Sequence, residues 1–214
     1  MKNLIITEGR DDQKFFIGLL SYLKIHGVDV IAIREKARGS KSDIFTTSQI
    51  QADVTSETQE LAAKILITCD ADFSKTGGLR DGFIKTKTAF QDLLKELENN
   101  EYYKENKTFG FFIIPNNEDD GNLETLYLNC LATDKSSLDC ADKYLNCLSE
   151  KISLEKSPKM RALSLLTPIG LSDDVYRVGF AAFDEKNKKY REGYWDFESP
   201  ALKPLSDFLK NYFN

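Results

Sequence analysis

Residues 64–74, which read KILITCDADFS, decide the fold. Residues 64–69 form an almost uninterrupted apolar run that ends at Asp70 and Asp72, two carboxylates one residue apart. A short apolar run bounded by polar residues predicts a fully buried strand of a parallel sheet. The two negative charges at its end need a further reason, because neighbouring carboxylates repel one another unless a partner compensates them.

Apolar strands alternate with amphipathic helices along the first half of the chain. The other predicted strands are residues 3–7, 28–33 and 109–114. The predicted helices are about residues 11–25, 43–52 and 85–99. Apolar strands that alternate with helices in this way predict βαβ units. We therefore expect an α/β fold with a four-stranded, mostly parallel central sheet flanked by helices.

The chain after Gly121 has a mostly helical pattern. Helices are predicted at residues 122–132, 138–154, 158–166 and 200–212, and residues 174–197 fit a helix or a strand equally well. The length of 214 residues suits one domain, or one core with an appended lobe. We expect an α/β core in residues 1–130 and a helical C-terminal part in residues 131–214 that packs on it, so that the chain forms a single compact unit.

The composition is that of an ordinary globular protein, with 41% hydrophobic and 29% charged residues. No apolar run approaches the roughly 18 residues of a membrane span, and the N-terminal MKNLIITEGR lacks the pattern of a signal peptide. We expect a cytoplasmic protein with no membrane partner. The net charge of −5 argues against non-specific coating of nucleic acid, which depends on Lys and Arg. It permits an enzyme that contacts phosphate through metal ions, because such ions need carboxylates.

Cysteine and histidine offer few alternatives to carboxylate chemistry. The four cysteines form no CxxC pair, and His26 is the only histidine. A structural zinc site is therefore not expected. A Ser-His-Asp or Cys-His mechanism would depend on His26 alone. Cys69 lies inside a predicted strand, where a buried thiol behaves as a small hydrophobic side chain.

Acidic residues follow three of the predicted strands. Glu8 comes after the first strand, with Asp12 four residues further on, and Asp70 and Asp72 come after the third. The run NNEDDG at 116–121 follows the fourth. Ligands of open parallel sheets bind outside the carboxyl ends of the strands, so we expect these side chains on one edge. In extended chain, Asp70 and Asp72 would also face the same side.

A divalent cation is the physical reason to gather like charges. Mg²⁺ takes one or two carboxylates and completes its coordination with water or substrate phosphate oxygens. Two such ions about 4 Å apart can hold the attacking and leaving oxygens of a phosphodiester. We predict that Glu8, Asp70 and Asp72 hold one Mg²⁺ or Mn²⁺ ion. Asp12 and Glu124 would complete its coordination or add a second ion.

Each acidic motif also has a purely structural interpretation. A DxD is expected roughly once by chance in a chain of this composition. Glu8 and Asp12 are also what the dipole favours at a helix N-terminus, and NNEDDG is typical of a solvated turn. The conjunction favours the metal site, because EGxxD follows one strand and DxD follows a later one on the same predicted edge.

These motifs carry a family resemblance. EGRDD at 8–12 after a strand, followed by DAD at 70–72 after a later strand, resembles the Toprim domain. That domain is shared by topoisomerases, bacterial primases, the ribosomal-RNA maturase ribonucleases and the overcoming-lysogenization-defect nucleases. The resemblance covers roughly residues 3–115. It implies a Toprim-like Rossmannoid fold in which Glu8 and the DxD pair bind Mg²⁺ and support the cleavage or formation of phosphodiester bonds.

Nearly the whole chain is similar to small stand-alone Toprim-like proteins of bacteria and archaea whose function is unknown. The shared features are a Pro-(N)-x-x-Gly-x-Leu-Glu segment, matched by residues 115–124, and an aromatic C-terminus, matched by 208–213. A late lysine assists catalysis in the overcoming-lysogenization-defect nucleases, so the resemblance implies that role for Lys159. The loop after the second strand departs from the family, because Gly39-Ser40 stands where a Gly-Gly pair is usual.

The first functional hypothesis is a Mg²⁺-dependent nuclease or phosphodiesterase that acts on nucleic acid through metal-activated water. Lys36, Arg38, Lys41 or Lys159 would neutralise phosphate charge in the transition state. A covalent tyrosine step is not expected, because Tyr22 and Tyr127 each fit core packing better. The second hypothesis is a non-catalytic module that binds nucleic acid or a nucleotide, and a primase-like nucleotidyltransferase ranks third. The sequence leaves open whether the substrate is DNA or RNA and whether the protein forms a homodimer.

Overall fold

The computed structural model describes residues 2–33, 46–48, 50, 62–76, 81–100, 107–130, 135–149, 158–166 and 196–213. These residues belong to two compact units, one of Met1–Leu123 with Pro204–Asn214 and the other of Glu124–Lys203. The predicted phosphate-binding residues Lys36, Arg38 and Lys41 lie outside the described residues, as do most of the helix predicted at 43–52 and nearly all of 174–197.

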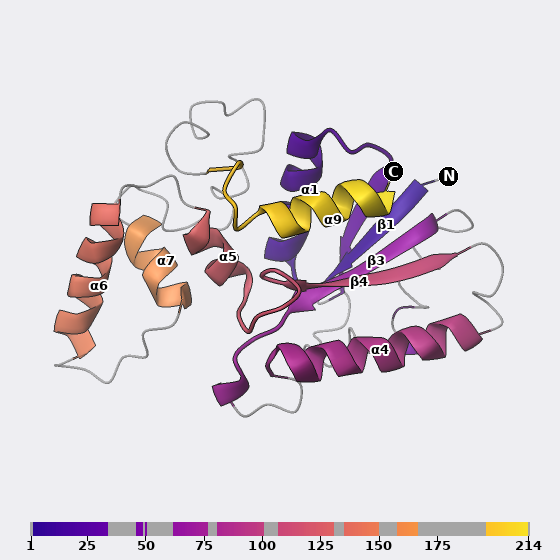
Figure 1. The fold of residues 1–214 in the computed structure, drawn as a ribbon, viewed down its shortest axis with the longest axis horizontal. Coiled ribbons are helices and arrows are strands. Elements are labelled where there is room, and N and C mark those ends of the chain that lie inside the picture. The colour runs from indigo at the N-terminus through magenta and orange to yellow at the C-terminus, as the bar shows by residue number, and fades with distance from the viewer. Residues whose placement is uncertain are drawn as a thin grey trace. The chain divides into compact units, whose positions relative to one another are not determined.

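The first unit contains a four-stranded parallel sheet (Figure 1). Its strands are β1 (Lys2–Thr7), β2 (Val28–Ala32), β3 (Ala62–Asp70) and β4 (Thr108–Ile114), in the order β2-β1-β3-β4. All three neighbouring pairs are parallel. The predicted α/β fold with a central four-stranded sheet is therefore confirmed, and the carboxyl ends of the strands share one edge.

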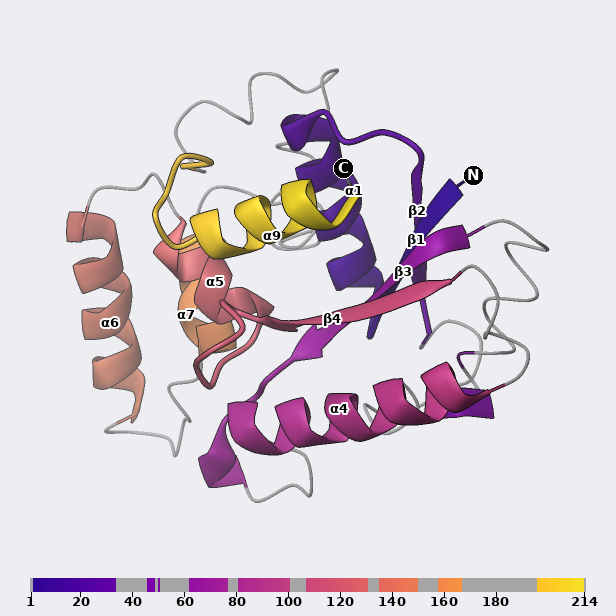
Figure 2. The same cartoon turned by 45° about the vertical axis from the view of Figure 1, so that its right-hand side comes forward.

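Helices cover both faces of this sheet. α4 (Phe83–Asn99) lies on one face, whereas α1 (Arg10–Leu23) and α9 (Lys203–Phe213) lie on the other, as the two views show (Figures 1 and 2). A short 3₁₀ turn, η2 (Ser74–Thr76), lies between β3 and α4. The last helix of the sequence therefore belongs to the first unit together with the sheet.

The core between the sheet and α4 follows from strand alternation. Every second residue of a strand points to the same face. One cluster of buried side chains combines strand residues with the inner face of α4: Leu4, Ile6, Ile65, Ile67, Cys69, Ile113, Phe83, Phe90, Leu93 and Leu97. Cys69 is thus a core residue, as its position in an apolar strand predicts. Its neighbours Thr68 and Asp70 point to the opposite face.

The C-terminal helix α9 is fixed to the other face by aromatic contacts and hydrogen bonds. The rings of Phe112 and Phe208 lie 5.2 Å apart between centroids. The Tyr212 hydroxyl lies 2.9 Å from the carbonyl oxygen of Ile65 and 3.0 Å from that of Thr108, and it can donate to either. Burial raises the pKa of the Tyr212 hydroxyl, so it stays a donor at neutral pH.

The observed ends of most elements differ from the predicted ones by a few residues, as β3 and α1 show. β3 extends beyond 64–69 at both ends, so Asp70 is its last residue instead of the first residue after it. α1 ends at Leu23, although the apolar pattern continues to about residue 25. Lys24 adopts a left-handed conformation with φ 57°, and its N–H bonds to carbonyl oxygens of the last helical turn. This C-cap stops the helix locally, before the predicted end at about residue 25.

The second unit contains α6 (Lys135–Ser149), α7 (Pro158–Leu166) and all of α5 (Leu123–Asn129) except its first residue. α6 and α7 pack together through buried side chains such as Leu145 and Ala162. A two-pronged ion pair joins them, with Arg161 Nε 2.7 Å and Nη2 2.9 Å from the two carboxylate oxygens of Asp142. Of the helices in the described ranges, none has the length and apolarity needed to cross a membrane.

Candidate functional site

The register of the parallel sheet brings Glu8 and Asp70 to the same edge. Thr7, the last residue of β1, pairs with Thr68 of β3. Glu8 therefore follows β1 one residue beyond this pair, and Asp70 ends β3 two residues beyond it on the neighbouring strand. Both side chains are partly exposed. Two of the three predicted principal ligands thus come from adjacent strand ends, as the βαβ pattern predicts.

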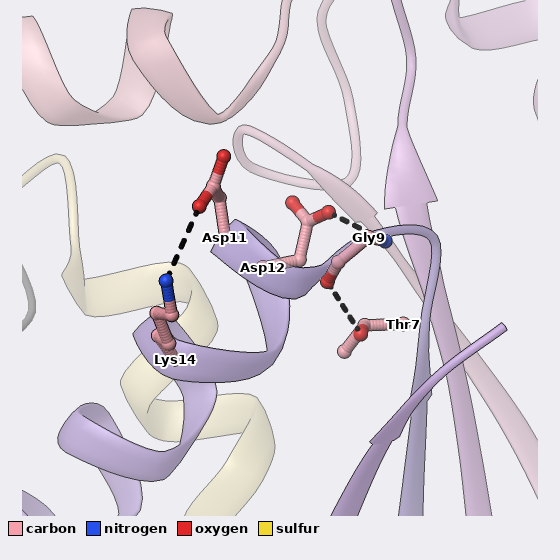
Figure 3. Close-up of polar contacts among 5 residues, drawn as sticks. All are labelled: Thr7, Gly9, Asp11, Asp12 and Lys14. Carbon is pink, nitrogen blue, oxygen red and sulfur yellow. Dashed lines mark hydrogen bonds and ion pairs between the residues drawn. The ribbon is translucent and has the colours of Figure 1, made fainter. Parts of the chain in front are cut away.

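The turn between β1 and α1 is held by its own polar groups (Figure 3). The Gly9 N–H donates to Asp12 Oδ2 over 3.0 Å, so the Asp12 carboxylate caps the helix from its third position. A Cβ at Gly9 would lie 3.3 Å from the same oxygen, which makes glycine the residue that fits there most easily. Asp11 forms an ion pair with Lys14 at 3.8 Å. Asp12 therefore has a structural role, and its predicted metal role stays a prediction.

Asp70 combines its position on the edge with a helix-capping contact. Its Oδ1 accepts a hydrogen bond of 2.9 Å from the backbone N–H of Leu123, the first residue of α5. A carboxylate at this position satisfies one of the N–H groups that lack a partner within the helix. The contact fixes one oxygen of Asp70 and thereby the orientation of the carboxylate.

Asp72 does not continue the extended chain of β3. Its φ is 58°, in the left-handed region that Asp tolerates better than most residues. The strand rule that would place Asp70 and Asp72 on the same side therefore does not apply, because it requires extended backbone at both positions. The Asp72 N–H donates to the Gly121 carbonyl over 2.7 Å, and the Gly121 N–H donates back over 3.0 Å. Asp72 is thus held by an isolated antiparallel bridge to Gly121.

The run that follows β4 is mostly a self-bonded turn. The Asn116 side-chain oxygen accepts hydrogen bonds from the N–H groups of Glu118 and Asp119 at 3.1 and 2.9 Å, and its amide donates to the Asp119 carboxylate. Asn117 has φ 65°, and its side chain accepts from the Ile113 N–H. These are the contacts that Asn and Asp form in turns. The first four residues of NNEDDG therefore form a turn, as the structural interpretation predicts.

Asp120 has a role that the sequence did not reveal. Its Oδ2 accepts from the Ser74 N–H at 3.0 Å, and its Oδ1 accepts from the Phe83 N–H at 2.7 Å. These hydrogen bonds hold the pKa of Asp120 below its ordinary value, and the bond from the Ser74 N–H contributes most to the lowering. One carboxylate thus joins the loop after β4 to the first residue of η2 and the first residue of α4. The available sequence signal was an Asp directly before a turn glycine, which is too common to be specific.

Thr68 carries an unusual buried hydroxyl close to this edge. It is fully buried, and its Oγ1 has no hydrogen-bond partner among the residues that the structure describes. Its register partner Thr7 is also fully buried, but the Thr7 hydroxyl lies 3.1 Å from the Gly9 carbonyl and 3.0 Å from that of Ile31. Strand alternation places Thr68 on the same face as Asp70, two residues before it.

The donor chemistry of the edge fits Mg²⁺ or Mn²⁺, since Glu8, Asp70 and Asp72 offer carboxylate oxygens. Within the described part of the chain, no group of three or more His, Cys, Asp or Glu side chains is arranged to hold a metal ion. Mg²⁺ is often held by only one or two carboxylates together with water and substrate phosphate. The ligand set therefore stays a prediction.

Two further predicted residues belong to the second unit. Glu124 is the second residue of α5 and is partly exposed, and Lys159 is the second residue of α7 and is exposed. Their predicted roles stay predictions. Tyr127 is buried, as expected for a core residue, and burial raises its pKa. Burial likewise raises the pKa of the Cys130 thiol to about 12, which opposes its use as a nucleophile.

The fold defines an α/β protein with a parallel sheet that has acidic residues at the carboxyl ends of two neighbouring strands. The chain belongs to the family described as "Protein of unknown function (DUF3226)", whose model matches residues 2–214. Comparison with curated proteins found no match. Comparison with solved structures found no match either. The family description states no activity, so the Toprim resemblance and the nuclease hypothesis stay predictions.

Proposed function

We propose that this protein is a nuclease with a Toprim-like fold that hydrolyses phosphodiester bonds of nucleic acid with Mg²⁺ or Mn²⁺. The single observation that carries the proposal is the register that brings Glu8 and Asp70 to adjacent strand ends. Carboxylates from two neighbouring strands on one edge are well placed to share a cation, and this is the edge where parallel sheets bind ligands. The Toprim resemblance of EGRDD and DAD supports the same conclusion.

In this proposal Glu8, Asp70 and Asp72 hold the ion, with Asp12 and Glu124 as additional ligands. The ion supplies positive charge to the phosphate oxygens and lowers the pKa of water when it is bound. The Leu123 N–H orients Asp70. The basic residues Lys36, Arg38, Lys41 and Lys159 are proposed to neutralise phosphate charge.

We further propose that the protein acts in the cytoplasm. Its four cysteines are all free thiols, and Cys140 and Cys147 are exposed. Exposed free thiols suit a reducing compartment.

A second candidate function is a module that binds nucleic acid or a nucleotide without cleaving it. The observation that favours it is the capping role of two predicted ligands. Asp12 accepts from the Gly9 N–H and Asp70 accepts from the Leu123 N–H, contacts that stabilise the fold without a metal. A protein of this kind would keep these carboxylates for structure alone.

The decisive experiment combines calorimetry with cleavage assays on Asp70→Asn. Asparagine keeps a side-chain oxygen for the Leu123 N–H, so the fold should be retained while the negative charge is lost. We expect wild type to bind Mn²⁺ and to cut single- or double-stranded DNA or RNA, and Asp70→Asn to lose both activities. Asp119→Asn is the matched control, because Asp119 is exposed and bonds only within its own turn in the contacts described above.

The outcomes separate the two candidate functions. Mn²⁺ binding and cleavage that are both lost in Asp70→Asn support the nuclease. Nucleic-acid binding that is equal in wild type and Asp70→Asn, without cleavage or Mn²⁺ binding, supports the binding module and refutes the nuclease. Equal cleavage by both proteins would show that Asp70 is not part of the active site.

A further inference from the structure

The segment Asp70–Asp72 is fixed at its backbone by three other parts of the first unit. The Ala71 N–H donates to the Ile114 carbonyl at 2.9 Å, and the Ala71 carbonyl accepts from the Gly82 N–H at 2.9 Å. The hydroxyl of buried Thr86 lies 3.3 Å from the same carbonyl oxygen. Asp72 and Gly121 also exchange reciprocal backbone bonds. The backbone N–H and the carbonyl of both Ala71 and Asp72 are therefore hydrogen-bonded. The segment is therefore held between β4 and the start of α4.

Asp120 closes this arrangement with its side chain. It directly precedes Gly121 in sequence, and its two oxygens accept from Ser74, two residues after Asp72, and from Phe83, directly after Gly82. A single carboxylate thus bonds to two backbone N–H groups that follow the segment, one at the start of η2 and one at the start of α4. Because each oxygen accepts from a different N–H, both oxygens are required, and only an ionised carboxylate supplies two acceptors in this geometry.

Two glycines lie beside Asp120. A Cβ at Gly82 would lie 3.0 Å from Ser74 Cβ and 3.3 Å from Asp120 Oδ1, and the φ of Gly82 is 97°. Gly121 has φ 149°, which also favours glycine. Two glycines therefore allow the backbone to approach the carboxylate and Asp72.

We propose that Asp120 is a positioning residue for Asp70 and Asp72, not a metal ligand. By holding Ser74 and Phe83, it fixes the left-handed turn at Asp72 and thereby the separation of the two candidate ligands. The inference rests on the proposed function, because it concerns the same metal site. Partners that orient metal ligands typically contribute about 10- to 100-fold to metal affinity.

The test measures Mn²⁺ affinity by calorimetry on the full chain of wild type, Asp120→Asn and the matched control Asp119→Asn. Asparagine offers one acceptor oxygen and one amide, so one of the two backbone N–H groups loses its acceptor. We expect Asp120→Asn to bind Mn²⁺ about 10- to 100-fold more weakly and Asp119→Asn to bind as wild type does. Amide hydrogen exchange without metal should be faster at Asp72, Ser74 and Phe83 in Asp120→Asn and unchanged elsewhere in the sheet.

The outcomes distinguish this inference from the proposed function. Wild-type affinity in Asp120→Asn overturns the positioning role while the metal site stands. An absence of Mn²⁺ binding in wild type overturns the proposed function and this inference with it. If Asp120→Asn does not fold, Ser74→Pro takes its place, because it removes both the N–H and the hydroxyl that Ser74 donates to Asp120, at an exposed residue, and leaves the carboxylate and the Phe83 N–H intact. Weaker Mn²⁺ binding by that variant supports the inference, and unchanged binding overturns it.

Discussion

Gly110→Ala should destabilise the protein through a single clash with the C-terminal helix. Gly110 lies inside β4, opposite Leu66 of β3. A Cβ at this position would lie 2.7 Å from Tyr212 Cε2 and 3.0 Å from Cζ, whereas carbon atoms in contact are normally about 3.5–4.0 Å apart. The ring would therefore have to move by more than about 0.5 Å.

The Tyr212 ring cannot move without losing other contacts. Its hydroxyl lies within hydrogen-bond distance of the Ile65 and Thr108 carbonyls, and its ring stacks on Phe208 with centroids 5.6 Å apart. Overpacking costs about 1–3 kcal/mol and the loss of a hydrogen bond about 1 kcal/mol. Replacing a strand glycine by alanine returns about 0.5–1 kcal/mol of chain entropy. We expect a net loss of about 1–3 kcal/mol in the free energy of unfolding.

A double-mutant cycle by urea unfolding tests this reasoning. In a Tyr212→Ala background the clash is absent, so Gly110→Ala should be neutral or stabilising by up to about 1 kcal/mol. The difference between the two backgrounds measures the contact itself. An equal cost of Gly110→Ala in both backgrounds, or a stabilisation in wild type, would refute the argument that Tyr212 requires glycine at this position.

Two further predictions concern single polar groups. Thr68→Val should leave the free energy of unfolding unchanged or raise it by up to about 1 kcal/mol, because it removes a buried hydroxyl that has no partner among the described residues. Thr7→Val is the control, because the Thr7 hydroxyl is hydrogen-bonded, and it should lower the free energy of unfolding by about 1 kcal/mol. Urea titration measures both. The folded pKa of Asp120 lies below its unfolded value, so its stabilisation is complete above about pH 4 and is lost as the pH falls through the folded pKa. Wild type should therefore lose more stability than Asp120→Asn between about pH 6 and about pH 3, and the difference should be small because solvent screens the side chain. Equal losses in the two proteins would contradict this assignment.

The strands and helices could be predicted where a local hydrophobic pattern in the sequence specifies them. The apolar run at 64–69 is the centre of β3, and the helix predicted at 158–166 is α7 (Pro158–Leu166). Local patterns also predicted that Glu8 and Asp70 share an edge, because βαβ units make neighbouring strands parallel and align their carboxyl ends. The boundaries were less predictable, since the end of α1 depends on the left-handed conformation of Lys24.

The contacts around the candidate site could not be predicted in the same way. Nothing in DADFS indicates that Asp72 leaves the extended conformation, because its left-handed turn is held by Gly121, 49 residues further along the chain. The Asp-Gly pair at 120–121 is too common in turns to indicate a special role for Asp120, and only the fold brings Asp120 to Ser74 and Phe83. The order β2-β1-β3-β4 and the position of Tyr212 against Gly110 likewise depend on distant segments.

The sequence by itself therefore determined the α/β class, the positions of the strands and the edge on which Glu8 and Asp70 lie. These features follow from hydrophobic periodicity and strand direction, which are properties of short segments. The tertiary structure alone decided how the later carboxylates are used: Asp70 caps α5, Asp120 joins two loops, and Asp72 is bridged to Gly121 in a left-handed conformation. The physical reason is that a carboxylate accepts a hydrogen bond from whichever N–H group the fold brings within about 3 Å, and a local pattern does not specify that group.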